Sequence, residues 1–176
     1  GPLQWDVARQ VAISTATNGT NTEANVDPSS RVSLEQLAPI ADMHVRNYTG
    51  LITGAGTALP NIVVTNHSTW VHHTLESYKP LFTQLATALS NPNVETSLPG
   101  TELDTELNIE ADQMATMMSS LNKMMAPAMM GMSIGSMIGQ LSLRAFGQYD
   151  LPIPREPKNQ MLLVASNVEQ FANDWS

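Results

Sequence analysis

The chain has 176 residues, which suits a single domain that buries a core without disulfides or structural metals. Its 16 acidic and 8 basic residues give a formal net charge of -8, and no Lys/Arg cluster is present, which argues against a nucleic-acid binder. Cysteine is absent, so disulfides, thiolate metal sites and cysteine nucleophiles are excluded. The first residues show no basic segment followed by an apolar run, so we expect no secretory signal and a cytoplasmic protein.

The amino-terminal third predicts two helices separated by a loop. Apolar residues at helical spacing predict a first helix over 5–15. The polar, turn-forming run 17–31 predicts a loop. Ser33 with Gln36 resembles a capping box, so we expect the second helix to begin there and to kink or start near Pro39.

A strand and a third helix follow. The β-branched residues of Asn61–Thr65 predict a short strand. Asn66 or Ser68 is expected to cap a helix that runs to about Ser90 and that Pro80 kinks or divides.

After a second predicted loop at 91–107, the run 108–150 predicts the central helix of the protein, which should end near Gly147. Nine of the eleven methionines lie between Met114 and Met137. Methionines at helical spacing can form an adaptable binding surface, but they are more typical of a core. We therefore predict a buried central helix, bent or interrupted near Pro127.

Gly131, Gly135 and Gly139 recur every four residues in this helix. This spacing leaves one face open to close approach by another helix, so we predict that these glycines are helix-packing residues. The uncharged stretch 124–143 has the length of a membrane span, but it contains proline, glutamine and serines. We expect no membrane span.

The last elements complete a mainly α fold. Residues 161–165 predict a strand, and Asn167 predicts the N-cap of a final helix. The sequence therefore predicts one mainly helical domain over 1–176, arranged around the Met/Gly-rich helix, with one or two short strands.

Few residues indicate chemistry. No two histidines have the fourfold spacing of a helical zinc site. His72 and Glu76 are four apart and are weak metal candidates, although such a pair is usually a surface contact. Arg144, Tyr149 and Asp150 are expected to form a structural polar cluster after the central helix. We predict no catalytic residue in the chain.

The segments WDVARQVA, STWVHHTLESYKPLF, GQYDLPIP and LLVASNVEQF resemble an uncharacterised bacterial zincin-like family over nearly the whole chain. Its members are described as zinc-dependent metallopeptidases or hydrolases, some of them associated with deazaflavin-cofactor biosynthesis. The resemblance implies a zinc-binding His-Glu-x-x-His helix after the region matching Asn167 to Ser176, and this sequence ends before such a motif.

We therefore expect the chain to be a fragment, the amino-terminal half of a zincin-like protein, inactive alone and without zinc of its own. The resemblance implies zinc in the complete family protein. The expected partner is the remainder of the polypeptide, including its catalytic helix, or a second copy of the chain. The alternative is a non-enzymatic helical interaction or oligomerisation module that uses the Met/Gly-rich helix.

Overall fold

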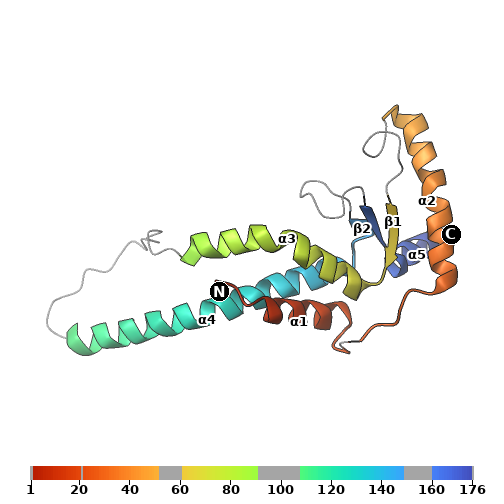
Figure 1. The fold of residues 1–176 in the computed structure, drawn as a ribbon. Coiled ribbons are helices and arrows are strands. Elements are labelled where there is room, and N and C mark those ends of the chain that lie inside the picture. The colour runs from red at the N-terminus through yellow and green to blue at the C-terminus, as the bar shows by residue number, and fades with distance from the viewer. Residues whose placement is uncertain (1, 21, 52–60, 91–107, 149–159, 176) are drawn as a thin grey trace.

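A computed structural model describes residues 2–20, 22–51, 61–90, 108–148 and 160–175. The elements follow in the order α1 (Trp5–Ala16), α2 (Pro28–Thr49), β1 (Asn61–Thr65), α3 (His67–Ser90), α4 (Asn108–Ser142), β2 (Gly147–Gln148), β3 (Gln160–Val164) and α5 (Ala165–Asp174). In Figure 1, α1 and α3 lie along α4 on one side of a small sheet, and α2 and α5 lie at the other end. The predicted mainly α fold is confirmed.

The sheet has three short strands in the order β1-β3-β2. β1 runs parallel to β3 and β2 runs antiparallel to it. β1 has the predicted bounds, and β3 begins one residue before the predicted strand. β2 was not predicted, because a two-residue strand has no hydrophobic alternation to detect.

The core lies where α1, α3 and the carboxyl-terminal half of α4 meet β3. Leu162 and Val164 of β3 and Val71 of α3 are fully buried, and Ile134 and Ile138 of α4 pack in the same cluster. Apolar burial of this kind is the main term that stabilises a fold.

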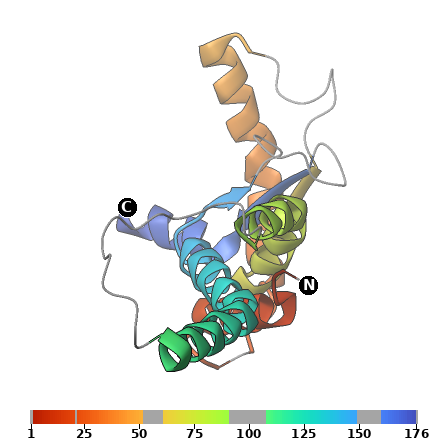
Figure 2. The same ribbon diagram turned by 90° about the vertical axis from the view of Figure 1, so that its left-hand side faces the viewer.

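Figure 2 shows α1 beside α4, and the glycines of α4 lie directly against α1. A Cβ atom added to Gly131 would stand 2.7 Å from the carbonyl oxygen of Gln4, and one added to Gly139 would stand 2.7 Å from that of Ala12. Ala8 and Ala12 of α1 have no exposed surface. The two backbones are therefore closer than larger side chains would permit.

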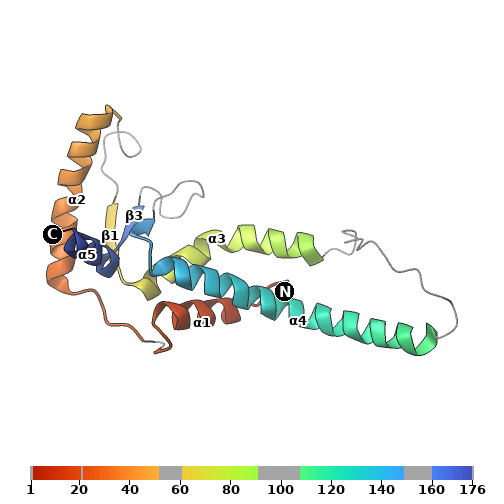
Figure 3. The same cartoon turned by 180° about the vertical axis from the view of Figure 1, so that it is seen from behind.

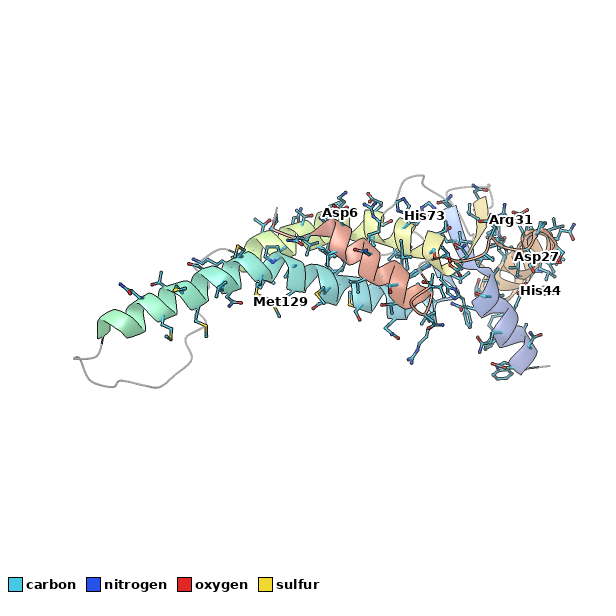
Figure 4. All side chains as sticks on the ribbon, turned by 90° about the horizontal axis from the view of Figure 1, so that it is seen from below. Asp6, Asp27, Arg31, His44, His73 and Met129 are labelled. Atoms are coloured by element: carbon cyan, nitrogen blue, oxygen red, sulfur yellow. The ribbon has the colours of Figure 1, made fainter. Side chains whose placement is uncertain are left out.

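The methionine-rich half of α4 is not buried. Every residue from 113 to 126 is exposed, and Met114 and Met124 keep 69% and 70% of their surface in solvent. The prediction that the methionine cluster belongs to the core is wrong. The physical reason is the length of α1, which reaches only to Pro127, whose carbonyl oxygen accepts a hydrogen bond of 3.2 Å from the Gln4 N–H. In Figure 4, Met129 is labelled near this limit, and methionine side chains project from the helix beyond it.

α2 begins earlier than the predicted capping box. Asp27 is the N-cap, and its carboxylate accepts hydrogen bonds from the backbone N–H groups of Ser29 and Ser30. The first turn of α2 therefore lies inside the run predicted as a loop, and the helix continues through Pro39. All of α2 belongs to the described part of the chain, and none of its residues is buried.

One further boundary differs from expectation. α5 begins at Ala165, so Asn167 lies inside the helix and is not its N-cap. α3 and α4 are each one continuous helix through Pro80 and Pro127, so neither proline divides its helix. None of the described helices is both long enough and apolar enough to cross a membrane. The predicted loop at 91–107 lies outside the described residues.

Candidate functional site

A polar cluster forms where the segment before α2 meets the first turns of α3 and α5. Glu23 comes from that segment, His67 and Ser68 begin α3, and Ser166 and Asn167 lie in the first turn of α5. Figure 3 shows the starts of α3 and α5 at one corner of the sheet, below β1 and β3. The cluster therefore joins residues from three distant parts of the sequence.

His67 is the centre of this cluster. Its Nδ1 atom lies 2.7 Å from Glu23 Oε1, and its Nε2 atom lies 2.9 Å from Asn167 Oδ1. The Ser166 hydroxyl oxygen lies 3.3 Å from the same Nε2 atom. Both ring nitrogens are thus within hydrogen-bond distance of an oxygen.

The carboxylate of Glu23 acts as a remote cap for α3. It accepts hydrogen bonds from the His67 N–H at 3.2 Å and from the Ser68 N–H and O–H at 2.8 Å each. Burial by itself raises the pKa of Glu23, but the hydrogen bonds from Ser68 and His67 outweigh it and leave the pKa below its ordinary value. A negative charge at a helix amino terminus also interacts favourably with the helix dipole.

Glu23, His67 and Ser166 stand in the order of a carboxylate–imidazole–serine triad. The geometry of Asn167 argues against nucleophilic catalysis there. Its Nδ2 group donates to the carbonyl oxygens of Ser142 and Ala145 at 2.8 Å each, so its Oδ1 atom faces His67. Because Oδ1 only accepts, His67 Nε2 must donate and has no lone pair to remove the Ser166 proton. In this arrangement the cluster connects elements and does not activate a nucleophile.

One hollow adjoins the cluster and a second lies nearby. One of about 240 Å³ is lined in part by Glu23, Ser166 and Glu169. Another of about 260 Å³ lies between α2 and β1 and is lined in part by Arg31 and Glu35. Both hollows are lined by a mixture of polar and apolar residues.

His72 and Glu76, the weak metal candidates, lie on the surface of α3. Glu76 Oε2 lies 3.8 Å from the Nζ atom of Lys79, and the His72 ring meets the His73 ring edge-on with 6.0 Å between centroids. Within the described ranges, no three His, Cys, Asp or Glu side chains are placed to hold a metal ion together. The described residues therefore do not fit the zinc that the resemblance implies, and no catalytic step through zinc follows from them.

Of the predicted polar cluster after the central helix, only Arg144 is described. It is exposed and lines a hollow of about 270 Å³ together with Phe146 and Phe171. Tyr149 and Asp150 lie outside the described residues.

Sequence reasoning missed the Glu23–His67–Asn167 cluster. Glu23 is 44 residues from His67, and Asn167 is 100 residues from it, so no local pattern joins them. The available signal was the capping sequence around His67, where Asn66 Oδ1 accepts a hydrogen bond of 2.9 Å from the Thr69 N–H. That signal locates the start of a helix without revealing its partners.

Comparison with solved structures shows a similar fold in a protein from Chloroflexus aurantiacus, described as a candidate hydrolase with a novel fold. The TM-score is 0.57 at 16% sequence identity, and the match covers 98% of this chain and 45% of that one. The chain thus spans less than half the length of that structure. No curated protein sequence matches the chain.

A family model supplies the assignment. The model of the zincin-like metallopeptidases matches residues 3–176, which include every described element. The chain belongs to the zincin-like metallopeptidase family.

Proposed function

We propose that residues 1–176 are a non-catalytic portion of a zincin-like hydrolase, and that the exposed face of α4 packs against a zinc-binding helix from outside these residues. The observation that carries the proposal is an apolar stripe on the amino-terminal half of α4, called here the outer seam. Its residues are spaced three and four apart: Met114, Met117, Met118, Leu121, Met124 and Met125. All six are exposed.

The outer seam continues a face that already packs against a helix. Steps of seven residues lead from Leu121 to Gly135 and from Met124 to Ile138, both of which are buried. A sevenfold repeat drifts by only about 20° per step around a straight helix, so these positions share one side of α4. The outer seam is therefore the part of this packing face that lies beyond the end of α1.

The length and composition of the outer seam suit a helix as its partner. Eleven residues separate Met114 from Met125, which corresponds to about 17 Å of helix. Burying one such side chain stabilises an interface by about 1.5–3 kcal/mol. Flexible methionines adapt to the shape of an apolar partner, and a helix lying in an apolar groove is a common form of recognition.

Two observations support a zinc-binding partner segment: the family of the chain and the greater length of the similar structure. The family is that of zincin-like metallopeptidases, and the similar structure is more than twice as long as the part matched here. In such a protein a bound zinc ion would polarise water for hydrolysis. The residues described here would supply the support on which that helix rests.

The decisive test is the reading frame after Ser176. A His-Glu-x-x-His sequence within the next few dozen codons is expected, and the protein expressed from the extended frame should bind one zinc per chain by atomic emission. A stop codon directly after Ser176 would overturn the proposal. So would stoichiometric zinc in purified 1–176 that is lost in the variants His72→Ala and Glu76→Ala.

The second candidate is a self-association module, which the same outer seam favours. A dimer of 1–176 in light scattering that Leu121→Glu converts to a monomer would support it. Gly135→Leu is unsuitable for this test, because Gly135 lies against the backbone of Ala8 and the change would disturb the fold.

A further inference from the structure

The Nε2 atom of His67 carries a proton. Asn167 has a fixed orientation, because its Nδ2 group donates to the carbonyl oxygens of Ser142 and Ala145. Its Oδ1 atom, 2.9 Å from His67 Nε2, can only accept. The proton of this hydrogen bond therefore belongs to His67.

The Nδ1 atom of His67 also carries a proton. It lies 2.7 Å from Oε1 of Glu23, and three further donors from His67 and Ser68 point at the same carboxyl group. These three donors outweigh burial and lower the pKa of Glu23, so the carboxyl group is ionised near neutral pH and can only accept. His67 and Glu23 therefore form an ion pair, with 14% and 20% of their side-chain surfaces exposed.

We propose that Glu23, His67 and Asn167 form a pH-sensitive clasp that holds the segment before α2 against the first turns of α3 and α5 while His67 is doubly protonated. This inference does not depend on the proposed function. Both ring N–H groups are needed, because one binds Glu23 and the other binds Asn167. An imidazole that has lost either proton places a lone pair against an oxygen and opens one side of the clasp.

The titratable groups described around His67 are acidic. Glu23 faces it from the segment before α2, and Asp27 and Glu169 line the adjoining hollow from the start of α2 and from α5. From α5 the ring also meets the Ser166 hydroxyl and the Asn167 amide. The last residue of α4, Ser142, contacts Asn167 through its uncharged carbonyl group. None of the residues lining this hollow is basic.

The pH window follows from the two charges. The pKa of Glu23 is lower in the folded chain than in the unfolded chain. Glu23 therefore stabilises the fold at a pH above its unfolded pKa, and this stabilisation is lost as pH falls through its folded pKa. Each ring nitrogen of His67 faces an oxygen, so removal of either ring proton by alkali breaks one hydrogen bond and opens the clasp on the alkaline side. The clasp is closed in weakly acidic solution.

The clasp acts on the attachment of α2. Glu23 lies four residues before Asp27, which caps α2, and no residue of this fully described helix is buried. A further tether, the hydrogen bond of 3.0 Å from Asn66 Nδ2 to the Ala24 carbonyl, does not depend on pH. Opening the clasp therefore loosens the amino-terminal end of α2 without releasing the segment entirely.

The first test is nitrogen NMR of His67 in the whole 176-residue chain. At pH 6 both ring nitrogens are expected to show imidazolium shifts, and above pH 8 one of them should show the shift of an unprotonated nitrogen. The backbone N–H signals of His67 and Ser68 should move with the same midpoint. A neutral His67 at pH 6 would overturn the proposal, whether or not any variant folds.

The second test measures urea unfolding of the whole chain at pH 6 and pH 8.5. The folding equilibrium constant of the wild type is expected to fall by about tenfold or more, as for the loss of one charge-assisted hydrogen bond. His67→Gln should remove most of this pH dependence. The matched control is His72→Gln, which removes an exposed imidazole of the same helix and should keep the wild-type dependence. Equal pH dependence in all three proteins would overturn the clasp.

Discussion

The two halves of α4 use one helical face in opposite ways. From Gly131 to Gly139 the buried face consists of glycine and isoleucine, and the small residues of α1 lie against its backbone. In residues 113–126 the same face is methionine and leucine, and it lies in solvent. Small residues fix a neighbour at one short distance, whereas methionines accept several shapes. The comparison indicates a helix whose inner half is committed to one neighbour and whose outer half is suited to another.

The largest effect is expected from a substitution that disrupts the contact between α1 and the inner half of α4. In Gly135→Leu the new side chain would meet the carbonyl oxygen of Ala8, which belongs to the backbone and cannot rotate away. We expect α1 to separate from α4, with a loss of about 3 kcal/mol or more, or failure to fold. Thermal unfolding followed by circular dichroism measures it, with Met118→Leu as the control in the outer half. A melting temperature unchanged by Gly135→Leu would show that α1 does not pack on this face.

A smaller loss of stability is expected from a substitution at Asn167, which contacts the carboxyl-terminal end of α4. Asn167→Ala removes the amide that donates to the carbonyl oxygens of Ser142 and Ala145. The free energy of unfolding should fall by about 1–3 kcal/mol, because these two carbonyl oxygens would remain without a hydrogen-bond donor in a largely buried site. Urea unfolding measures this loss. Gln170→Ala, at an exposed position of the same helix, should stay within about 0.5 kcal/mol of the wild type.

The third prediction tests the clasp through Glu23, a residue that lies outside α4. Glu23→Gln removes the negative charge that accepts hydrogen bonds from Ser68 and His67. We expect the free energy of unfolding to fall by about 1 kcal/mol near neutral pH. Because the folded pKa of Glu23 is lowered, the difference from wild type should shrink as pH falls through that value. Urea unfolding at pH 7 and in acid measures it. A difference that grows in acid would contradict the assigned sign.

The smallest effect sharpens the contrast between the two halves. Leu121→Ala in the outer seam should change the stability of a monomeric chain by less than about 0.5 kcal/mol, because its side chain is already half in solvent. Ile138 lies on the same side of the helix in its inner half and is buried in the core. Ile138→Ala should therefore lower the free energy of unfolding by about 2–4 kcal/mol. Similar losses in both variants would show that the outer seam is covered in the isolated chain.

The parts of the fold that follow from local sequence were predicted well. The β-branched run Asn61–Thr65 is β1, and the first and third helices have nearly the predicted bounds. Capping was less predictable, because Asp27 and the Ser33 region both offer helix starts and the choice between them depends on local geometry.

Burial and the polar cluster could not be read from sequence in the same way. Helical spacing shows that methionines share a face, but it cannot show whether a neighbour is long enough to cover that face. Glu23, His67 and Asn167 are brought together by the positions of three elements, and none of them has a distinctive local pattern. Of the predicted site residues, Gly131, Gly135 and Gly139 lie in a close contact with α1, and His72 and Glu76 lie at the surface.

Pro127 lies where the covered and uncovered halves of α4 meet, beside Gln4 at the beginning of α1. Because proline has no amide hydrogen, the carbonyl of Lys123 lacks its usual partner one turn away, and bending there disrupts less of the helical bonding than bending elsewhere. A bend at this position would change the direction of the outer half and leave the contact of Gly131, Gly135 and Gly139 with α1 in place. A segment that packs on the outer seam would therefore not need to disturb the core.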